Sequence, residues 1–143
     1  MAGDTNANKE LVHRLYGTLH AEGDAAAARE ILAEDYVDHD IPGIGQGGRE
    51  ELISAVQAVR ASFPDVKPEL FELVAEDDLV AVRVEAGGTH SGEEFMGIPA
   101  AGASIRWKEI HLFRCRDGRI VEHRGVFDLI AIMQQLGALP SPG

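Results

Sequence analysis

The sequence predicts an α+β fold, with helices in the first part of the chain and antiparallel strands in the rest. Up to Pro64 the apolar residues recur at intervals of three and four, as on one face of a helix. After Pro64 apolar and polar residues alternate in runs that end at turns rich in Gly and Asp. We therefore expect a curved antiparallel sheet of about four strands wrapped on three N-terminal helices, with a short C-terminal helix. Such a cone leaves a cavity between the sheet and the helices.

Start and stop signals divide the helical part of the chain. Gly23 ends the first helix, Asp24 is a candidate N-cap for the alanine-rich second helix, and Pro64 stops the third. Residues 1–7 are small and polar, and we expect them to be frayed. The predicted helices cover residues 8–22, 25–33 and 49–62.

The segment between the second and third helices, residues 36–48, contains several glycines and Pro42. It is predicted to be a loop, or a strand that continues into a loop. Near the end of the chain, Asp128 precedes a short apolar helix that Gly137 closes. The predicted strands cover residues 69–75, 79–86 and 105–127, the last as a hairpin.

The composition predicts one globular domain over all 143 residues. The formal net charge of −11, from 24 acidic and 13 basic residues, argues against nucleic acids and anionic membranes as partners. The single cysteine, Cys115, excludes an internal disulfide bond and a cysteine-based metal cluster. We see no apolar run long enough to span a membrane and no basic-then-apolar leader, and we expect a cytoplasmic protein.

The first strand of the hairpin carries two titratable groups beside an indole. Alternate residues of a strand share a face, so Trp107, Glu109 and His111 lie on the same side. This combination is more typical of a pocket wall than of plain core. A two-residue turn would pair His111 with Arg124, whereas a bulged turn would pair it with Gly125, and the residues alone allow both.

His111 is the first candidate for catalysis, because an imidazole titrates near neutral pH and can move a proton to or from an enol or phenol. The alternative is a structural histidine within a half-polar sheet. Glu109 could orient His111 or act as a base itself, since a carboxylate on an apolar wall is expected to have a raised pKa. The alternative for Glu109 is an ion pair with a neighbouring cation.

Asp38 and His39 follow the second helix where it gives way to a loop, a position that rims the cavity of such a cone. Asp38 is a candidate acid or base, and His39 is a candidate contact with the ligand. The alternative is that Asp38 and Asp40 cap local turns. Asp128 is better explained as the N-cap of the last helix, and it can still lie near the pocket.

The other candidate ligand contacts are His123 and a set of large side chains suited to stacking on a flat molecule. For most of these large side chains, the alternative is that they belong to the ordinary apolar core and do not contact a ligand. His13 and His20 on the first helix are expected at the surface or an edge. The six histidines lack the spacing of a metal site, so no metal is expected. The large side chains are Trp107, Phe113, Phe127, Met96 and Tyr16.

Four short segments, in this order and spacing, together resemble the SnoaL-like polyketide cyclase family. They are YVDHD at residues 36–40, FMGIP at 95–99, EIHLF at 109–113 and the ending FD at 127–128 through QQLG at 134–137. The resemblance covers almost the whole chain and implies a ketosteroid-isomerase-like α+β cone. It also implies small, mostly apolar substrates, many of them polycyclic aromatic polyketides. Chemistries of the family include aldol ring closure and, in close relatives, hydroxylation of an anthracycline ring; no metal or tightly bound organic cofactor is typical of the cyclases.

One position departs from the family pattern. In the cyclases a catalytic aspartate follows a His-Arg-like pair on the last strand, whereas here His123-Arg124 is followed by Gly125. His111 matches the strand histidine of the cyclases. The resemblance favours the bulged register, in which Gly125 opposite His111 would leave open volume for a substrate ring.

The residues and the resemblance together predict a cofactor-free enzyme that tailors an anthracycline-type aromatic polyketide by acid–base chemistry. Ring closure and hydroxylation are both candidate reactions, and hydroxylation would require a separate reductase. One alternative is an epoxide hydrolase or ketosteroid-isomerase-like enzyme with Asp38 and Glu109 as paired carboxylates. Another is a non-catalytic small-molecule binding module. The outer face of the hairpin, with Ile110 and Leu112 among charged residues, predicts a homodimer through the sheet.

Overall fold

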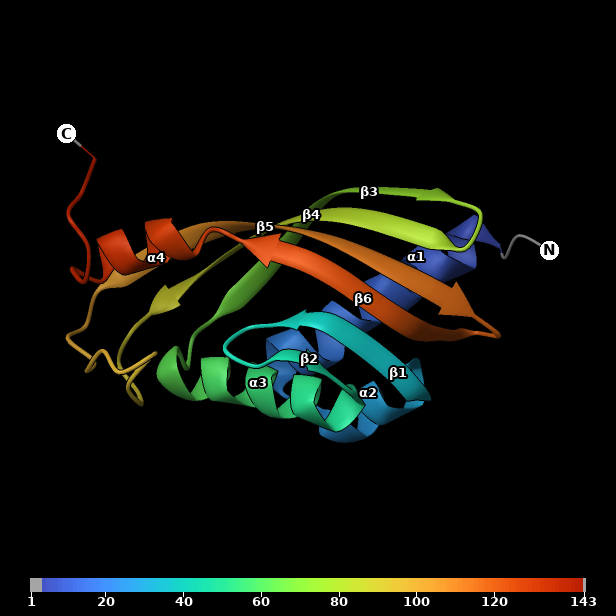
Figure 1. Ribbon diagram of the computed structural model, residues 1–143, viewed down its shortest axis with the longest axis horizontal. Helices are drawn as coiled ribbons and strands as arrows, with labels where there is room; N and C mark the ends of the chain where they lie inside the picture. The colour runs from blue at the N-terminus through green and yellow to red at the C-terminus, as the bar shows by residue number, and fades with distance from the viewer. Residues whose placement is uncertain (1–3, 143) are drawn as a thin grey trace.

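A curved six-stranded sheet forms one layer of the computed structural model, which describes residues 4–142, and helices cover one of its faces (Figure 1). The strand order is β2-β1-β6-β5-β4-β3, and all neighbours are antiparallel except β1 and β6, which are parallel. The predicted α+β cone is confirmed. The elements are α1 (Thr5–Leu15), η1 (Tyr16–His20), α2 (Ala25–Ile31), β1 (Leu32–Ile41), β2 (Gly45–Gly47), α3 (Arg49–Ser62), β3 (Lys67–Glu76), β4 (Leu79–Thr89), β5 (Ser104–Arg116), β6 (Arg119–Phe127) and α4 (Leu129–Gln135).

The prediction of about four strands, all antiparallel, was wrong, because β1 and β2 occupy the segment that was expected to be mainly loop. β1 also takes over the end of the predicted second helix, which stops at Ile31. Four acidic residues in β1 hide its alternation in the sequence. Its inward residues are nevertheless buried, including Tyr36 and Asp38. β1 joins the sheet beside β6 and so brings Asp38 to the cavity side.

The first helix begins earlier than predicted. The carboxylate of Asp4 accepts hydrogen bonds from the backbone N–H groups of Asn6, at 2.9 Å, and Ala7, at 3.3 Å. These bonds satisfy donors that a helix N-terminus otherwise leaves free. The predicted fraying of residues 1–7 is therefore wrong from Asp4 onward, and residues 1–3 lie outside the described part of the chain.

The β5–β6 hairpin has the register in which His111 lies opposite Gly125, which confirms the alternative favoured by the family resemblance. Asp117 and Gly118 form a two-residue turn with φ values of 52° and 75°. The bulge lies within the strands, next to Cys115, and not at the turn as predicted. It shifts the pairing by one residue and so sets which side chains face the helices.

The apolar core consists of two clusters between the sheet and the helices. The larger cluster packs the first helices and α3 against the middle of the sheet and includes Leu15, Leu19 and Phe113. The smaller cluster, around Phe63 and Trp107, packs against α4. Burial of each such side chain contributes about 1.5–3 kcal/mol relative to exposure. Within residues 4–142, no helix combines the length and apolar character needed to cross a membrane.

Candidate active site

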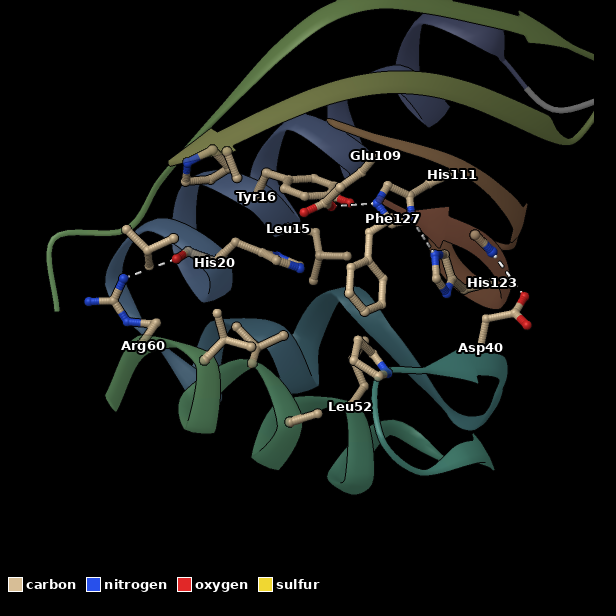
Figure 2. Close-up of a pocket in the computed structure, with 18 of the residues that line it drawn as sticks. Leu15, Tyr16, His20, Asp40, Leu52, Arg60, Glu109, His111, His123 and Phe127 are labelled. Carbon is tan, nitrogen blue, oxygen red and sulfur yellow. Dashed lines mark hydrogen bonds and ion pairs between the residues drawn. The ribbon is translucent and has the colours of Figure 1, made fainter. Parts of the chain in front are cut away.

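A cavity of about 1000 Å³, including its open mouth, lies between the sheet and the helices (Figure 2). Its wall is mostly apolar, and the polar side chains that reach it come from β5 and β6 on the sheet and from η1, β1 and α3. The lining residues from these two strands are Trp107, Glu109, His111, Phe113, His123, Gly125 and Phe127.

Four titratable side chains from three neighbouring strands form one hydrogen-bonded row, Glu109–His111–His123–Asp38, which we call the polar chain. Oε1 of Glu109 lies 2.7 Å from Nε2 of His111, and Nδ1 of His111 lies 2.8 Å from Nε2 of His123. Nδ1 of His123 lies 2.8 Å from Oδ1 of Asp38. Figure 2 shows the first three members across the cavity wall. The strand register produces the row, because Asp38 lies beside His123 in the parallel β1–β6 pair.

Aromatic side chains close both ends of the polar chain. The indole Nε1–H of Trp107 donates to Oε2 of Glu109 at 2.6 Å. The hydroxyl of Tyr36 donates to Oδ2 of Asp38 at 2.5 Å, and the backbone N–H of Asp40 donates to Oδ1 at 2.9 Å. Both carboxylates therefore have partners on each oxygen and serve to orient the two imidazoles.

The hydrogen bonds determine how many protons the polar chain holds. An ionised carboxylate only accepts, so Nε2 of His111 and Nδ1 of His123 must each carry a proton. The contact between the two rings requires one further proton, on Nδ1 of His111 or on Nε2 of His123. The proton of this contact is therefore shared between the two rings, which lie between the two carboxylates.

The predicted rise in the pKa of Glu109 was wrong. Burial does raise the pKa of Glu109, but the hydrogen bond and charge of His111 and the indole of Trp107 outweigh burial and hold it below its ordinary value of 4.5. The pKa of Asp38 is also below its ordinary value. Burial raises this pKa, but the hydrogen bond and charge of His123 lower it by more than burial raises it. Neither carboxylate is therefore suited to accept a proton near pH 7.

Gly125 allows the two imidazoles to meet. A Cβ atom at this position would lie 2.8 Å from Nε2 of His123 and 3.0 Å from Cε1 of His111, and closer still to Nδ1 of His111. The prediction of open volume opposite His111 was therefore wrong, because the imidazole pair fills it. An aspartate at this position, as in the family pattern, could not coexist with the His111–His123 hydrogen bond.

Three of the predicted contact residues lie away from the cavity. His39 lies on the other face of β1, with Nε2 2.8 Å from Oε2 of Glu122. Met96 is 52% exposed in the β4–β5 connection. Asp128 accepts a hydrogen bond from the backbone N–H of Ala131 at 3.0 Å, which confirms the predicted N-cap. The geometry therefore gives none of the three a direct contact with a ligand in the cavity.

The remaining aromatic candidates line the cavity together with the polar chain. The ring centroid of Tyr16 lies 6.1 Å from those of both His111 and Phe113. Burial raises the pKa of the Tyr16 phenol well above its ordinary value, and the negative charges of Glu109 and Asp38 raise it further. Its hydroxyl therefore stays protonated and can donate a hydrogen bond in the cavity.

His20 was predicted at the surface or an edge, and this prediction was wrong. The wide π-helical turn η1 carries it into the cavity wall, where its ring stacks on Tyr16 with centroids 4.1 Å apart. Burial lowers the pKa of His20 to about 4, although Glu109 opposes the shift. The sequence contains a signal for this position of His20. Tyr16 is a candidate cavity residue, and His20 follows it by four residues, so the two share a face of the helix.

The described residues contain no group of three or more His, Cys, Asp or Glu side chains arranged to hold a metal ion. His111 and His123 lie near two carboxylates, but all their ring nitrogens are hydrogen-bonded within the polar chain. This arrangement leaves none of the four nitrogens free as a ready-made ligand for a cation.

The fold and the cavity agree with comparisons to known proteins. The family described as SnoaL-like polyketide cyclase matches residues 10–136, and the chain belongs to this family. The aklanonic acid methyl ester cyclases DnrD of Streptomyces peucetius and DauD of Streptomyces sp. (strain C5) are each 33% identical to this chain over 92 residues. Each match covers 63% of this chain, and the two matches cover 62% of DnrD and 56% of DauD.

Solved structures show the same fold over nearly the full chain. IdmH of Streptomyces antibioticus, a candidate polyketide cyclase, is 36% identical with a TM-score of 0.79, over 91% of this chain and 98% of IdmH. TsrD of Streptomyces laurentii is 26% identical with a TM-score of 0.85, over 96% of this chain and 99% of TsrD. AclR of Streptomyces galilaeus, a candidate hydroxylase, is 24% identical with a TM-score of 0.86, over 98% of this chain and 87% of AclR. At that identity, AclR supports the fold alone.

Proposed function

We propose that this chain is a tailoring enzyme that closes a carbon ring in an aromatic polyketide by acid–base chemistry. The observation that carries the proposal is the His111–His123 hydrogen bond, which is held between the buried carboxylate of Asp38 and the half-buried carboxylate of Glu109 at the wall of a mostly apolar cavity. Family membership and the cyclase relatives support ring closure as the first candidate reaction.

The reaction begins with a proton on a carbon that neighbouring carbonyl groups acidify. The pair first loses the shared proton, and one ring turns so that the nitrogen that faced the other imidazole faces the substrate instead. That nitrogen of His111 or His123 then accepts the proton from carbon. The enolate carbon then attacks a carbonyl carbon of the same molecule, so a C–C bond forms and the carbonyl π electrons move to oxygen. The imidazole pair returns the proton to that alkoxide. The product therefore has the mass of the substrate.

The carboxylates make the imidazole pair suitable for this task. Glu109 and Asp38 hold the two rings in fixed orientations and keep positive charge on the pair when it carries the shared proton. That charge lies where a substrate enolate would develop negative charge, within a largely apolar wall that weakens screening. Preorganised charge of this kind stabilises the transition state more than the bound substrate.

Hydroxylation is the second candidate reaction, because Gly125 replaces the aspartate that the cyclases use. It would take one oxygen atom from O₂ into the product and release the other as water. The two electrons required would come from NADPH through a separate reductase.

The hydrolase or isomerase alternative depended on paired carboxylates in the cavity. Asp38 and Glu109 lie at opposite ends of the polar chain, with both imidazoles between them. They therefore do not form the close carboxylate pair that this alternative requires. The experiment below distinguishes an enzyme from the other alternative, a non-catalytic binding module.

The test is incubation of the purified protein with aklanonic acid methyl ester, with and without a reductase and NADPH under oxygen, followed by mass spectrometry. A new product of unchanged mass that forms without reductant would support ring closure. A gain of one oxygen that requires the reductant would indicate hydroxylation. Binding without any product would favour the non-catalytic module.

Two variants and a matched control sharpen this test. His111→Ala and His123→Ala each remove one ring of the pair and should lower turnover by about 10²-fold or more. His39→Ala removes a histidine that hydrogen-bonds Glu122 away from the cavity, and it should retain wild-type turnover. Wild-type turnover in both cavity variants would contradict the proposed roles.

A further inference from the structure

Asp40 forms two hydrogen bonds next to the imidazole pair, one from its backbone and one to its side chain. Its backbone N–H donates to Oδ1 of Asp38 at 2.9 Å, and its own Oδ2 accepts from the backbone N–H of Gly125 at 3.0 Å (Figure 2). Oδ1 of Asp38 is also the atom that is bonded to His123. A single residue of β1 therefore contacts both the carboxylate that holds His123 and the glycine opposite His111.

The strand register explains why a side chain makes the bond to Gly125. The parallel pairing of β1 with β6 extends to Asp38 and His123, and β1 then shifts its register between Asp38 and Ile41. Gly125 lies two residues beyond the end of this pairing. Its N–H is bonded by a carboxylate of β1, where a regular parallel ladder would supply a backbone carbonyl. Asp40 therefore continues the link between the two strands past the point where their backbones separate.

The backbone of Gly125 lies against the contact between the two imidazoles. A Cβ atom on this glycine would be 2.8 Å from Nε2 of His123 and closer still to Nδ1 of His111. These two nitrogens are the atoms that form the contact between the rings, at 2.8 Å. Any shift of the Gly125 backbone therefore changes the room in which the two rings meet.

We propose that Asp40 is a positioning residue that keeps the two imidazoles in hydrogen-bond contact. Its carboxylate holds the backbone of Gly125, and its backbone N–H holds the carboxylate of Asp38. A hydrogen bond to an ionised acceptor is shorter and stronger than one between neutral groups, which suits it to fix a backbone. The inference rests on the proposed function for its effect on turnover, whereas the contact between the rings can be observed without substrate.

The exposure of Asp40 separates this role from a purely structural one. Asp40 is an exposed residue of the cavity lining, so water can replace its carboxylate as the acceptor for the N–H of Gly125. Loss of the carboxylate should therefore change stability little. Water does not join β1 to β6, however, so the position of Gly125 is then no longer fixed. The expected defect is in the geometry of the rings and in catalysis.

The test compares two substitutions of Asp40 with a matched control. Asp40→Ala removes the acceptor for the N–H of Gly125, whereas Asp40→Asn keeps an acceptor oxygen and removes only the charge. Glu34→Ala, which removes another exposed carboxylate of β1, is the control. NMR of the imidazole nitrogens, assigned with His111→Ala and His123→Ala, reports the contact between the rings without substrate. Steady-state kinetics with aklanonic acid methyl ester and thermal unfolding complete the comparison.

We expect Asp40→Ala to shift the signals of the two facing nitrogens, to lower kcat about tenfold and to leave KM and the unfolding midpoint nearly unchanged. Asp40→Asn should recover most of kcat, and Glu34→Ala should match wild type throughout.

Unchanged nitrogen signals in Asp40→Ala would overturn the inference. An equal loss of kcat in Asp40→Asn and Asp40→Ala would also overturn it, because the charge and not the hydrogen bond would then be required. Shifted nitrogen signals in Asp40→Ala, together with a wild-type protein that forms no product, would support the inference and contradict the proposed function alone.

Discussion

Gly125 lies directly opposite His111 across the β5–β6 pair, and a Cβ atom on Gly125 would overlap the imidazole of His111. The glycine therefore does more than lack the carboxylate of the family pattern. It makes room for the hydrogen bond between His111 and His123, which places two imidazoles where the family pattern has the carboxylate. At this position a carboxylate of the family pattern is therefore replaced by a contact between two imidazoles.

Gly125→Ala should separate the two imidazoles. We expect turnover to fall by about 10²-fold or more, because the shared proton is lost. The free energy of unfolding should fall by about 1–3 kcal/mol, because the added methyl overpacks the site. Steady-state kinetics and chemical denaturation measure the two effects. Gly17→Ala is the control, since a Cβ there meets nothing within 4 Å; equal turnover in the two variants would contradict the role of Gly125.

Asp38→Asn should lower kcat by about 10²-fold and leave KM nearly unchanged. The reason is that Asp38 fixes the orientation and charge of His123 without lining the cavity itself. The amide keeps the size of the side chain but removes the negative charge that holds the imidazolium. Asp35→Asn, on the exposed side of the same strand, is the control. A rise in KM at constant kcat would indicate a binding role instead.

The buried His20 should make stability depend on pH in the range from 6.5 to about 4. Its pKa is lowered from 6.5 in the unfolded chain to about 4 in the folded protein by burial. Between these values the unfolded chain binds a proton that the folded protein does not, so the free energy of unfolding falls as pH falls. Urea denaturation at several pH values should show a smaller fall for His20→Phe than for wild type. His13→Phe should keep the wild-type slope, and an identical slope in all three proteins would show that burial does not shift this pKa.

The outer face of the sheet is expected to form a homodimer contact. Ile110 and Val126 are paired across β5 and β6 and are 49% and 69% exposed, and Leu112 beside them is 42% exposed. Light scattering should give the mass of a dimer for wild type and of a monomer for Ile110→Glu. Ile44→Glu, at an exposed position between β1 and β2, should remain dimeric. A wild-type monomer at all concentrations would remove this prediction.

The local parts of the fold could be predicted from sequence, because each has a periodic pattern with clear ends. The hairpin is the best example, since alternation and the Asp117-Gly118 turn set its two strands. β1 could not be predicted in the same way, because its acidic residues interrupt the apolar alternation. Asp38 can be buried there because His123, Tyr36 and the backbone N–H of Asp40 supply its hydrogen bonds. Those partners are not visible until the strands are placed.

The candidate site was predictable to the same extent. The face shared by Trp107, Glu109 and His111 follows from alternation within one strand. The contact between His111 and His123 depends on a bulge, whose place the sequence does not specify. The low pKa of Glu109 depends in turn on that pairing and could not be derived from an apolar wall alone.

The parallel β1–β6 pair also has a consequence for how the protein becomes functional during its synthesis. Asp38 and His123 are 85 residues apart in the chain, and nothing else in the sheet brings β1 to its place beside β6. A chain emerging from the ribosome can form its helices and its β3–β4 hairpin early, because their contacts are local. The polar chain must wait until β6 has been made. The polar chain therefore forms in one late step of folding, after most of the cavity wall has been synthesised.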